Sequence, residues 1–300
     1  MPEGPEVTIV TKQLNSIVQD KVIKDIELLS GRYTKKEPSG FTDFVDGAIN
    51  HESQKVLGVS NKGKFIYWIT SSGVIFSTLG MTGTYKTKDN KYARVRWTFD
   101  DNTEIYYSDM RNFGTLKFYF GSESSKELNK KLSEIGPDML NEPCDEKTWL
   151  QICEKRKNQS LVKFLMEQKN VSGVGNIYKS ESLFLAGLAP YRKVRDCTSE
   201  ELSRLYTAVK TVLKNSYETG GATIRNYSDL YNNQGQYVAF PSKADEMMKS
   251  RIGVMVYSQK EDPYGNPIQK IKLDDQRTTY YSPEVQKWRK TVMKNYYEKF

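Results

Sequence analysis

The 300-residue sequence predicts an α+β protein: an N-terminal helix with an antiparallel β-sandwich, a C-terminal helical domain, and a β-hairpin near the end. Three observations predict this fold. Apolar residues recur at helical spacing up to Val18, strand-like runs of β-branched and aromatic residues follow to Phe120, and helical patterns continue from Lys126 to Tyr217. A chain of this length can bury two separate cores.

The first predicted helix runs from Pro5 to Val18, and its apolar residues share one face: Val7, Val10, Leu14, Ile17 and Val18. Pro5 fits a first turn, where its missing N–H would have no helical partner. Strands are predicted at residues 22–29, 55–60, 64–70, 74–78, 93–99, 104–108 and 116–120. Short strands separated by turn residues are typical of an antiparallel sandwich.

Beyond a linker at residues 121–125 the pattern becomes helical, at residues 126–135, 146–154, 161–168, 177–186 and 199–217. Strand patterns return at residues 252–258, 268–273 and 278–281, with a turn at 262–267. The basic, aromatic residues 285–300 could be helical or frayed. We therefore predict a sandwich domain at 1–121, a helical domain at 126–250, a hairpin at 251–286 and a tail at 287–300.

The net charge of +8 favours a polyanionic partner, most often nucleic acid. The three cysteines are widely spaced at Cys144, Cys153 and Cys197, which gives neither a disulfide framework nor a CxxC metal site and fits a reducing, intracellular compartment. A single histidine, His51, argues against histidine zinc sites and Ser-His-Asp triads. No apolar run is long enough to span a membrane, so we expect no membrane partner.

The first six residues, Met1 to Glu6, carry an unusual chemistry if Met1 is removed, because Pro2 then has a free secondary amine. An α-amino group titrates at about 7.7–8.0, against about 10.4 for a lysine, so more of it is unprotonated at neutral pH. Attack by this amine on a sugar C1′ or an aldehyde gives an iminium, which acts as an electron sink. Glu3 and Glu6 lie within one helical turn and could move protons. Taken alone, the stretch favours the simpler interpretation, a helix start with a proline and two acids.

A Gly-x-Gly turn, Gly173 to Gly175, leads into the predicted helix at 177–186. Such a turn exposes backbone N–H groups at a helix N-terminus, which is a geometry that binds phosphate. The Asn176 amide could donate to the same phosphate. Together with the helix at 161–168, the turn gives a helix-two-turn-helix motif; an ordinary tight turn is the alternative.

At this point the chain resembles the formamidopyrimidine-DNA glycosylase and endonuclease VIII (Fpg/Nei) family of base-excision repair enzymes. The resemblance rests on motifs in family order: Pro2–Glu6, Thr78–Gly83, Asp109–Gly114 and Gly173–Pro190. Several motifs in order are far more specific than any one of them. The resemblance implies an enzyme that binds damaged DNA.

The resemblance also implies roles for the residues near the N-terminus. Pro2 would attack C1′ of a damaged nucleoside, expel the base and form a Schiff base, while Glu3 would act as acid and base. Glu6 would orient the site or the lesion. Lys64 would contact the phosphates that flank the lesion, with Lys62 as a rival for this role.

Three further residues, Met81, Arg111 and Phe113, match the family's triad that fills the space left by a flipped base. Extruding a nucleotide costs a few kcal/mol, and an adaptable methionine, a stacking aromatic ring and a hydrogen-bonding arginine suit the vacated space. The alternative is that Met81 and Phe113 are core residues. Their glycine neighbours in turn-like stretches favour the first interpretation.

The C-terminal hairpin departs from the family pattern, which usually ends in a four-cysteine zinc finger. Ser282 and Val285 stand where the second CxxC would be, and the first pair is deleted or replaced around Tyr264. Without thiolates there is no tetrahedral zinc site, so we predict a zincless finger, no metal and no cofactor. Apolar and aromatic packing alone would hold its turn. Arg277 aligns with the finger-tip arginine that grips phosphates near the lesion and assists elimination.

The sequence thus predicts a bifunctional DNA glycosylase and AP lyase, acting as a monomer on duplex and also single-stranded damaged DNA. It would remove oxidised pyrimidines, formamidopyrimidines and hydantoins and cut the strand by β,δ-elimination. The segment at 220–227 matches the family's Gly-Gly-Thr-Thr-Leu-type helix start. The loop at 228–249 is longer and differs in sequence in the region that surrounds the extruded base, so substrate choice is the least constrained point. The alternatives are a non-catalytic protein that binds damaged DNA with the same fold, and an RNA-binding protein of translation.

Overall fold

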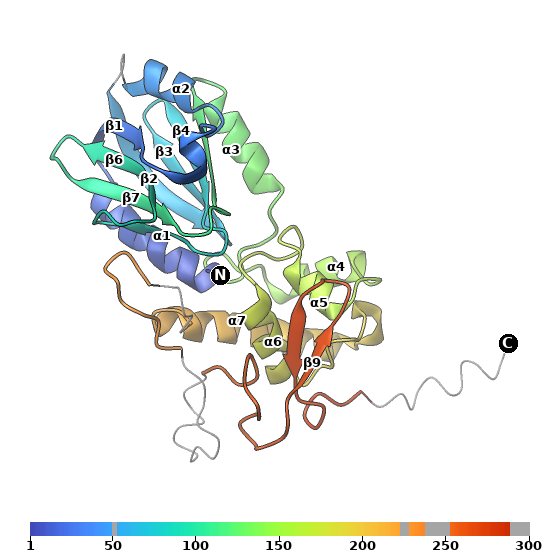
Figure 1. Ribbon diagram of the computed structural model, residues 1–300. Coiled ribbons are helices and arrows are strands. Elements are labelled where there is room, and N and C mark those ends of the chain that lie inside the picture. The colour runs from blue at the N-terminus through green and yellow to red at the C-terminus, as the bar shows by residue number, and fades with distance from the viewer. Residues whose placement is uncertain (50–52, 223–227, 238–252, 289–300) are drawn as a thin grey trace. The chain divides into compact units, whose positions relative to one another are not determined.

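The computed structural model describes residues 1–49, 53–222, 228–237 and 253–288 (Figure 1). The chain divides into two compact units. The first holds Met1–Pro143, Gln168–Gly173 and Leu213–Val238, and the second holds Cys144–Glu167, Val174–Val212 and Ala239–Phe300. His51, the end of the 220–227 segment, most of the 228–249 loop and the tail from residue 289 lie outside the described residues.

The first unit begins with helix α1, Gly4–Val18, which lies along strand β2, Gln54–Lys62 (Figure 1). Its predicted apolar face is confirmed, since Val7, Val10, Leu14 and Val18 are all buried. Burial of each such side chain contributes about 1.5–3 kcal/mol. The helix is therefore fixed to the sheet close to its first turn, where the predicted site begins.

One antiparallel sheet forms the rest of this unit's framework, in the order β5-β7-β6-β1-β2-β3-β4-β8. Besides β2 its strands are β1 (Val22–Leu28), β3 (Phe65–Thr70), β4 (Gly73–Thr78), β5 (Gly83–Lys86), β6 (Ala93–Phe99), β7 (Glu104–Asp109) and β8 (Thr115–Phe120).

The sheet folds into two facing halves at the β1–β2 pair, whose register holds only Val22↔Lys55 and Ile23↔Gln54. Trp68 from β3 and Trp97 from β6 are fully buried, and their rings stack with centroids 5.5 Å apart. Side chains from the two halves therefore meet in one core, and the predicted sandwich is confirmed.

Short elements complete the first unit: a 3₁₀ turn at Gly31–Thr34, helix α2 at Phe41–Phe44, a π-helical turn at Val45–Ile49, and helix α3 at Ser124–Ser133. The rings of Phe41 and Phe44 pack on Phe118 of β8 at 5.3 and 5.4 Å. Neither α2 nor β5 was predicted, because four residues carry too little periodicity to indicate a helix or a strand.

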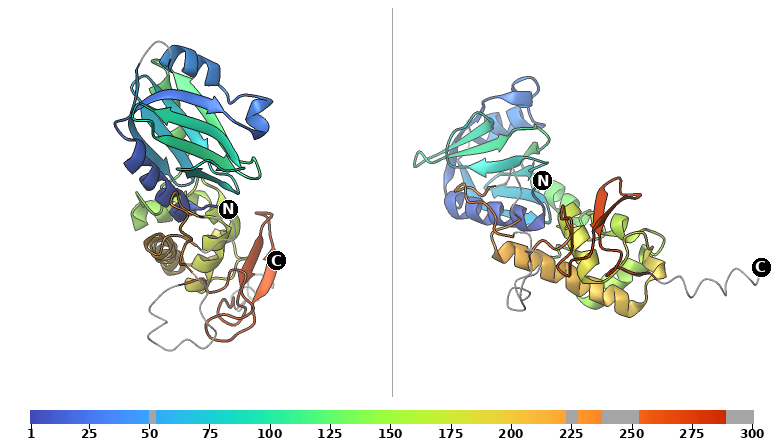
Figure 2. Two further views of the ribbon diagram at one scale, coloured as in Figure 1. Left: turned by 60° about the vertical axis from the view of Figure 1, so that its left-hand side comes forward. Right: turned by 60° about the horizontal axis from the view of Figure 1, so that its bottom comes forward.

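The second unit contains helices α4 (Glu146–Lys155), α5 (Leu161–Met166), α6 (Asn176–Leu185) and most of α7 (Ser199–Glu218), with a 3₁₀ turn at Val194–Asp196. Trp149 of α4 lies at its core, with its ring 5.3 Å from that of Phe164 and its Nε1 donating to the carbonyl of Leu202. Strands β9 (Gln269–Lys272) and β10 (Thr278–Tyr281) form the predicted antiparallel hairpin, drawn in orange-red in Figure 2.

The strand predicted at 252–258 is wrong for the described residues 253–258, which form turns and one isolated bridge. The backbone N–H groups of Met255, Val256 and Tyr257 instead donate to the buried carboxylate of Glu181, with N···O distances of 2.6, 3.0 and 2.7 Å. Burial raises the pKa of Glu181 to about 7, and the three hydrogen bonds oppose that shift. The Glu181 carboxylate on α6 therefore accepts the hydrogen bonds that a neighbouring strand would accept in a sheet.

Within the ranges that the structure describes, no helix is both long enough and apolar enough to cross a bilayer.

Candidate active site

A cavity of about 310 Å³ opens beside the N-terminus in the first unit. Pro2 lines it together with the two candidate lysines, Lys62 and Lys64. The rest of its lining comes from α1, the sheet, α3 and the loop before Gly173: Met1, Val7, Phe65, Thr78, Leu79, Gly80, Lys131, Ile135, Gln168 and Ser172. The structure therefore brings the predicted amine and the predicted phosphate-binding lysines to one cavity.

Backbone contacts fix the position of Pro2. The N–H of Gly4 donates to the carbonyl of Gly173 at 2.8 Å. A Cβ on Gly4 would lie 2.9 Å from the Cα of Gly173, and one on Gly63 would lie 2.6 Å from the Cβ of Ser172. Gly63 also has a φ of +58°, in the left-handed region. Three backbone segments thus touch directly, and the turn that carries Lys64 lies against the start of α1.

Both predicted acids are buried in the first unit, with Glu3 2% and Glu6 0% exposed. The Glu6 carboxylate accepts the backbone N–H of Glu3 at 2.7 Å and that of Ala222 at 2.8 Å. Glu6 therefore ties the chain beside Pro2 to the segment that follows α7. This geometry fits a residue that orients the site, which stays a prediction.

The N-terminal amine of Met1 has a pKa below its usual value of 8.0. Burial is the main cause, and the nearby positive charges of Lys64 and Arg111 lower the pKa further, while Glu3 and Glu6 raise it. This environment favours the neutral, nucleophilic form of an amine. Met1 is present in this structure, so the Pro2 nitrogen is here an amide.

The two candidate lysines differ in what they contact. Lys62 donates its Nζ to the backbone carbonyl of Leu132 at 2.9 Å. Lys64 instead lies close enough to the N-terminal amine to lower its pKa. Lys64 is therefore the lysine that acts on the N-terminal amine, and contact with the phosphates that flank the lesion stays a prediction.

The predicted void-filling residues lie on two turns of the first unit. Met81 is half-buried between β4 and β5, whereas Arg111 and Phe113 are exposed after β7. Phe113 is 54% exposed, so the alternative that it is a core residue is wrong, and the guanidinium of Arg111 lies 5.0 Å from its ring centroid. The Phe113 ring therefore lies at the surface against the Arg111 guanidinium and is accessible to a binding partner.

Sequence reasoning gave no role to Asp109, which joins these two turns. Its carboxylate accepts the hydroxyl of Thr82 at 2.6 Å and the backbone N–H groups of Arg111 and Gly114 at 3.2 and 2.8 Å. Because Thr82 follows Met81 directly, one buried acid sets the spacing of the whole triad. The signal in the sequence was an aspartate at the start of a turn.

Asp138 was missed as well. Its carboxylate accepts the N–H of Gly63 at 2.8 Å and, from its own loop, the N–H of Leu140 at 2.9 Å and the amide of Asn141 at 2.8 Å. Asp138 is 2% exposed and anchors the turn that carries Lys64. Its own loop shows the Asx-turn pattern, which is visible in a sequence, but its bond to Gly63 is not.

In the first unit, Gly173 has a φ of +92°, which a side chain would strain. In the second unit, Gly175 caps the start of α6 in an extended conformation. Asn176 donates its Nδ2 to the carbonyl of Thr278 in the hairpin at 3.0 Å. The amide predicted to bind phosphate is therefore already bonded to the finger, which brings the helix-two-turn-helix and the finger together within one unit.

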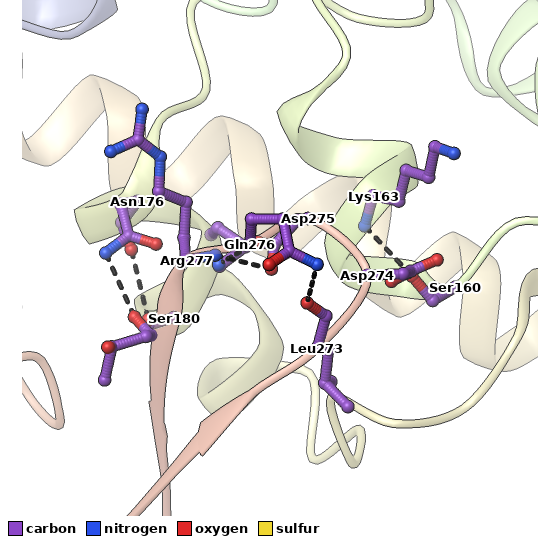
Figure 3. A network of polar contacts seen from close by, with 11 residues as sticks. Ser160, Lys163, Asn176, Ser180, Leu273, Asp274, Asp275, Gln276 and Arg277 are labelled. Carbon is purple, nitrogen blue, oxygen red and sulfur yellow. Dashed lines mark hydrogen bonds and ion pairs between the residues drawn. The ribbon is translucent and has the colours of Figure 1, made fainter.

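Arg277 lies at the tip of that finger, just before β10, and is exposed. Its backbone N–H donates to Asp275 at 3.1 Å, and its side chain extends away from the loop (Figure 3). The preceding Gln276 has a φ of +58°. The structure thus presents the predicted arginine to solvent from a tightly turned loop.

The finger does not fit a zinc ion. Val285 has no side-chain ligand atom, and Ser282 offers a hydroxyl in place of a thiolate. Among the described residues, no group of three or more histidine, cysteine, aspartate or glutamate side chains could hold a metal. Tetrahedral zinc requires four such ligands, so the residues present do not supply the site that the family usually has.

The expectation that apolar and aromatic packing alone holds the finger is wrong. Tyr257 and Tyr280 do pack, with ring centroids 5.0 Å apart. The turn at 262–267 is nevertheless closed by the Asp262 carboxylate, which accepts the N–H groups of Tyr264 and Asn266, each at 2.9 Å. Polar turn chemistry therefore supplements the aromatic contacts.

Three family models match the chain: the formamidopyrimidine-DNA glycosylase N-terminal domain over residues 1–116, the H2TH domain over residues 135–228, and the C-terminal domain over residues 246–287. Formamidopyrimidine-DNA glycosylase from Bacillus cereus strain ATCC 14579 is 31% identical over 300 residues, covering 95% of this chain and 99% of that protein. The protein of the same name from Bacillus subtilis strain 168 is 30% identical, covering 93% and 97%.

Solved structures agree. The MutM (Fpg) protein of Thermus thermophilus superposes with a TM-score of 0.77 at 25% identity, covering 95% of this chain and 98% of that one. A Lactococcus lactis FPG mutant in complex with a Fapy-dG containing DNA gives 0.75 at 26%, covering 96% and 100%. These matches define the class, the DNA glycosylases of base excision repair. The chain belongs to the formamidopyrimidine-DNA glycosylase family, which confirms the resemblance seen in the motifs.

Proposed function

We propose that the chain is a bifunctional DNA glycosylase and AP lyase, with the Pro2 amine as its nucleophile once Met1 has been removed. The observation that carries the proposal is the N-terminal cavity. Pro2 and Lys64 line it, and the N-terminal amine there, which is that of Met1 in the unprocessed chain, has its pKa lowered mainly by burial. Two buried carboxylates, Glu3 and Glu6, follow directly in the chain. A module that only bound DNA would need no such environment.

In the proposed reaction the Pro2 nitrogen forms a bond to C1′ as the bond from C1′ to the base breaks. The departing base takes up a proton equivalent to the one that the Pro2 nitrogen loses, and Glu3 donates a proton to the sugar ring oxygen as the ring opens to the iminium. The Glu3 carboxylate left by that step takes a proton from C2′, and the electrons of that C–H bond expel the 3′ phosphate; loss of the C4′ proton to solvent then expels the 5′ phosphate. Water then releases the sugar fragment from Pro2.

The proposed substrate is damaged DNA, which the net charge of +8 favours through phosphate contacts. Met81, Arg111 and Phe113 would occupy the space of the extruded nucleotide. Formamidopyrimidines, hydantoins and oxidised pyrimidines are the proposed lesions. The Lactococcus lactis relative solved with a Fapy-dG containing DNA supports the first of these. We propose action as a monomer, on duplex and on single-stranded DNA.

Borohydride trapping tests the nucleophile. Mass spectrometry first establishes that Met1 is absent, and the protein is then reduced in the presence of a duplex with one abasic site. A covalent adduct is expected for the wild type and none for Pro2→Gly. If Pro2→Gly traps as well as the wild type, Pro2 is not the nucleophile.

The alternative is a non-catalytic protein that binds damaged DNA with the same fold. While Met1 is attached, the Pro2 nitrogen is an amide and cannot attack C1′. A preparation that retains Met1 should therefore bind an abasic-site duplex without cutting it. If the fully processed protein also binds without cutting, the chain is a DNA-binding protein and the proposed lyase is rejected.

A further inference from the structure

A buried ion pair joins the helix-two-turn-helix to the finger within the second unit. The Nζ of Lys179 on α6 lies 2.5 Å from Oδ2 of Asp275, in the loop between β9 and β10. The two side chains are 0% and 1% exposed. A lysine in a DNA-binding segment is usually a phosphate contact, but Lys179 is sealed from solvent and cannot reach one.

Asp275 uses its two oxygens for two different tasks. Oδ2 meets Lys179, and Oδ1 accepts the backbone N–H of Arg277 at 3.1 Å. One carboxylate therefore links a helix to the peptide group of the arginine at the finger tip. Any movement of the loop that shifts this peptide group must break either the ion pair or the hydrogen bond.

Helix α6 holds the other side of Arg277 as well. Asn176, one turn before Lys179, donates to the carbonyl of Thr278 at 3.0 Å. The neighbouring Asp274 accepts the hydroxyl of Ser160, the residue that caps α5. Figure 3 shows Asn176 and Asp274 on either side of the Arg277 side chain. The tip is thus bonded to α6 and to the residue that caps α5, while the Arg277 side chain extends away from the loop.

The ion pair is poorly explained as a source of stability alone. Removing two charges from water is costly, and a buried pair is often no more stabilising than well-packed apolar residues. Such a pair restricts the loop to the one conformation in which the two charges meet, because burying either charge without the other is strongly unfavourable. A finger whose residues do not fit a zinc ion has particular need of such a constraint.

We propose that Lys179 and Asp275 are positioning residues for Arg277, and that their ion pair fixes the finger tip. The inference rests on the proposed function, since it takes Arg277 as a residue that grips DNA phosphates near the lesion and assists elimination. Lys179 itself touches no substrate and acts only through the loop.

Hydrogen exchange in the DNA-free protein tests the loop without assuming any activity. Lys179→Met should speed exchange at residues 273–278 by about tenfold or more, because the loop loses its anchor. The double variant Lys179→Met/Asp275→Asn leaves no unpaired buried charge, so it tests the loop even if the single variant folds poorly. Glu201→Gln is the matched control, since it weakens a largely buried pair with Arg192 that includes no residue of the finger. Unchanged exchange at the tip in both Lys179 variants would overturn the proposal.

Single-turnover cleavage of an abasic-site duplex then tests the link to Arg277. Lys179→Met should lower the rate by about tenfold to a hundredfold, as expected for a misplaced group, with DNA binding changed far less. Adding Lys179→Met to Arg277→Ala should cause no further loss, and Lys179→Arg should restore most of the activity. Independent, additive losses would overturn the positioning role. A wild type without activity would refute the proposed function, while hydrogen exchange would still decide whether the pair orders the tip.

Discussion

The backbone N–H of Glu3 donates a 2.7 Å hydrogen bond to the carboxylate of Glu6, within the first turn of α1. The other Glu6 oxygen accepts the N–H of Ala222, more than two hundred residues later in the chain. One buried side chain thus closes the start of the helix and binds it to a distant segment. The residue that aligns with a site-orienting acid is also a structural anchor.

Glu6→Gln should destabilise the protein, because an amide can accept only one of the two hydrogen bonds and turns an NH₂ towards the other donor. A buried N–H left without an acceptor costs about 1–3 kcal/mol. Urea unfolding measures the change, with the half-exposed Glu134→Gln as control, expected to stay within about 0.5 kcal/mol. Equal unfolding midpoints for the two variants would show that the Glu6 bonds contribute nothing.

Lys64→Met should raise the pKa of the N-terminal amine towards 8.0. Burial, the main cause of the lowered pKa, remains, but the positive charge that disfavours protonation is gone. The pKa is measured by NMR on the amine of the chain that retains Met1, after isotope-labelled reductive methylation. Lys62→Met is the matched control and should leave the value nearly unchanged, because Lys62 is bonded to Leu132. A larger rise in the Lys62 variant would reverse the assignment of the two lysines.

Gly63→Ala should destabilise the protein more than Gly121→Ala. Both glycines have a positive φ, +58° and +85°, so both alanines carry the conformational cost of roughly 1 kcal/mol. Only at Gly63 would the new Cβ meet another atom, Cβ of Ser172 at 2.6 Å, whereas nothing lies within 4 Å of it at Gly121. Overpacking adds about 1–3 kcal/mol. Thermal unfolding of the two variants measures the difference. Equal losses of stability would mean that the contact between Gly63 and Ser172 relaxes without a cost in free energy.

Glu181 should make stability fall as pH rises from about 4.5 to about 7. Burial raises its folded-state pKa to about 7 from its usual value of 4.5, so across this window the folded protein holds a proton that the unfolded chain has released. The contribution is full below the lower value and is lost above the higher one. Glu181→Gln stays neutral at every pH, so the wild type should lose stability relative to this variant across the window. Parallel unfolding curves from pH 4 to 8 would contradict the shifted pKa.

Long periodic segments could be predicted from the sequence, and short or non-local ones could not. The start of α1 differs from its prediction by one residue, because five apolar positions on one face define a helix. The strand expected at 252–258 failed because its N–H groups find their acceptor on Glu181, more than seventy residues earlier. Local patterns of β-branched residues carry no information about such a partner.

The candidate site likewise contains residues that could be predicted from the sequence and residues that could not. Residues that would touch DNA stand in recognisable motifs, so Pro2 and Arg111 were found from the sequence. The acids that hold those motifs in place were not, since Asp109 and Asp138 act through backbone N–H groups of other turns. Lys179 received no role from the sequence, because nothing in a sequence distinguishes a buried lysine from an exposed one.

The contact among Gly4, Gly63 and the backbone at 172–173 has a consequence for how this protein can change over generations. The start of α1 and the turn that carries Lys64 both lie against residues 172–173, and a Cβ added to Gly4 or Gly63 would come within 3 Å of atoms there. No larger residue fits at either glycine unless the neighbouring atoms move. Selection can therefore retune the acids, the lysines and the finger gradually, but it can only keep or lose this contact as a whole. Among descendants of this chain, these glycines should be the last residues to vary while the site still works.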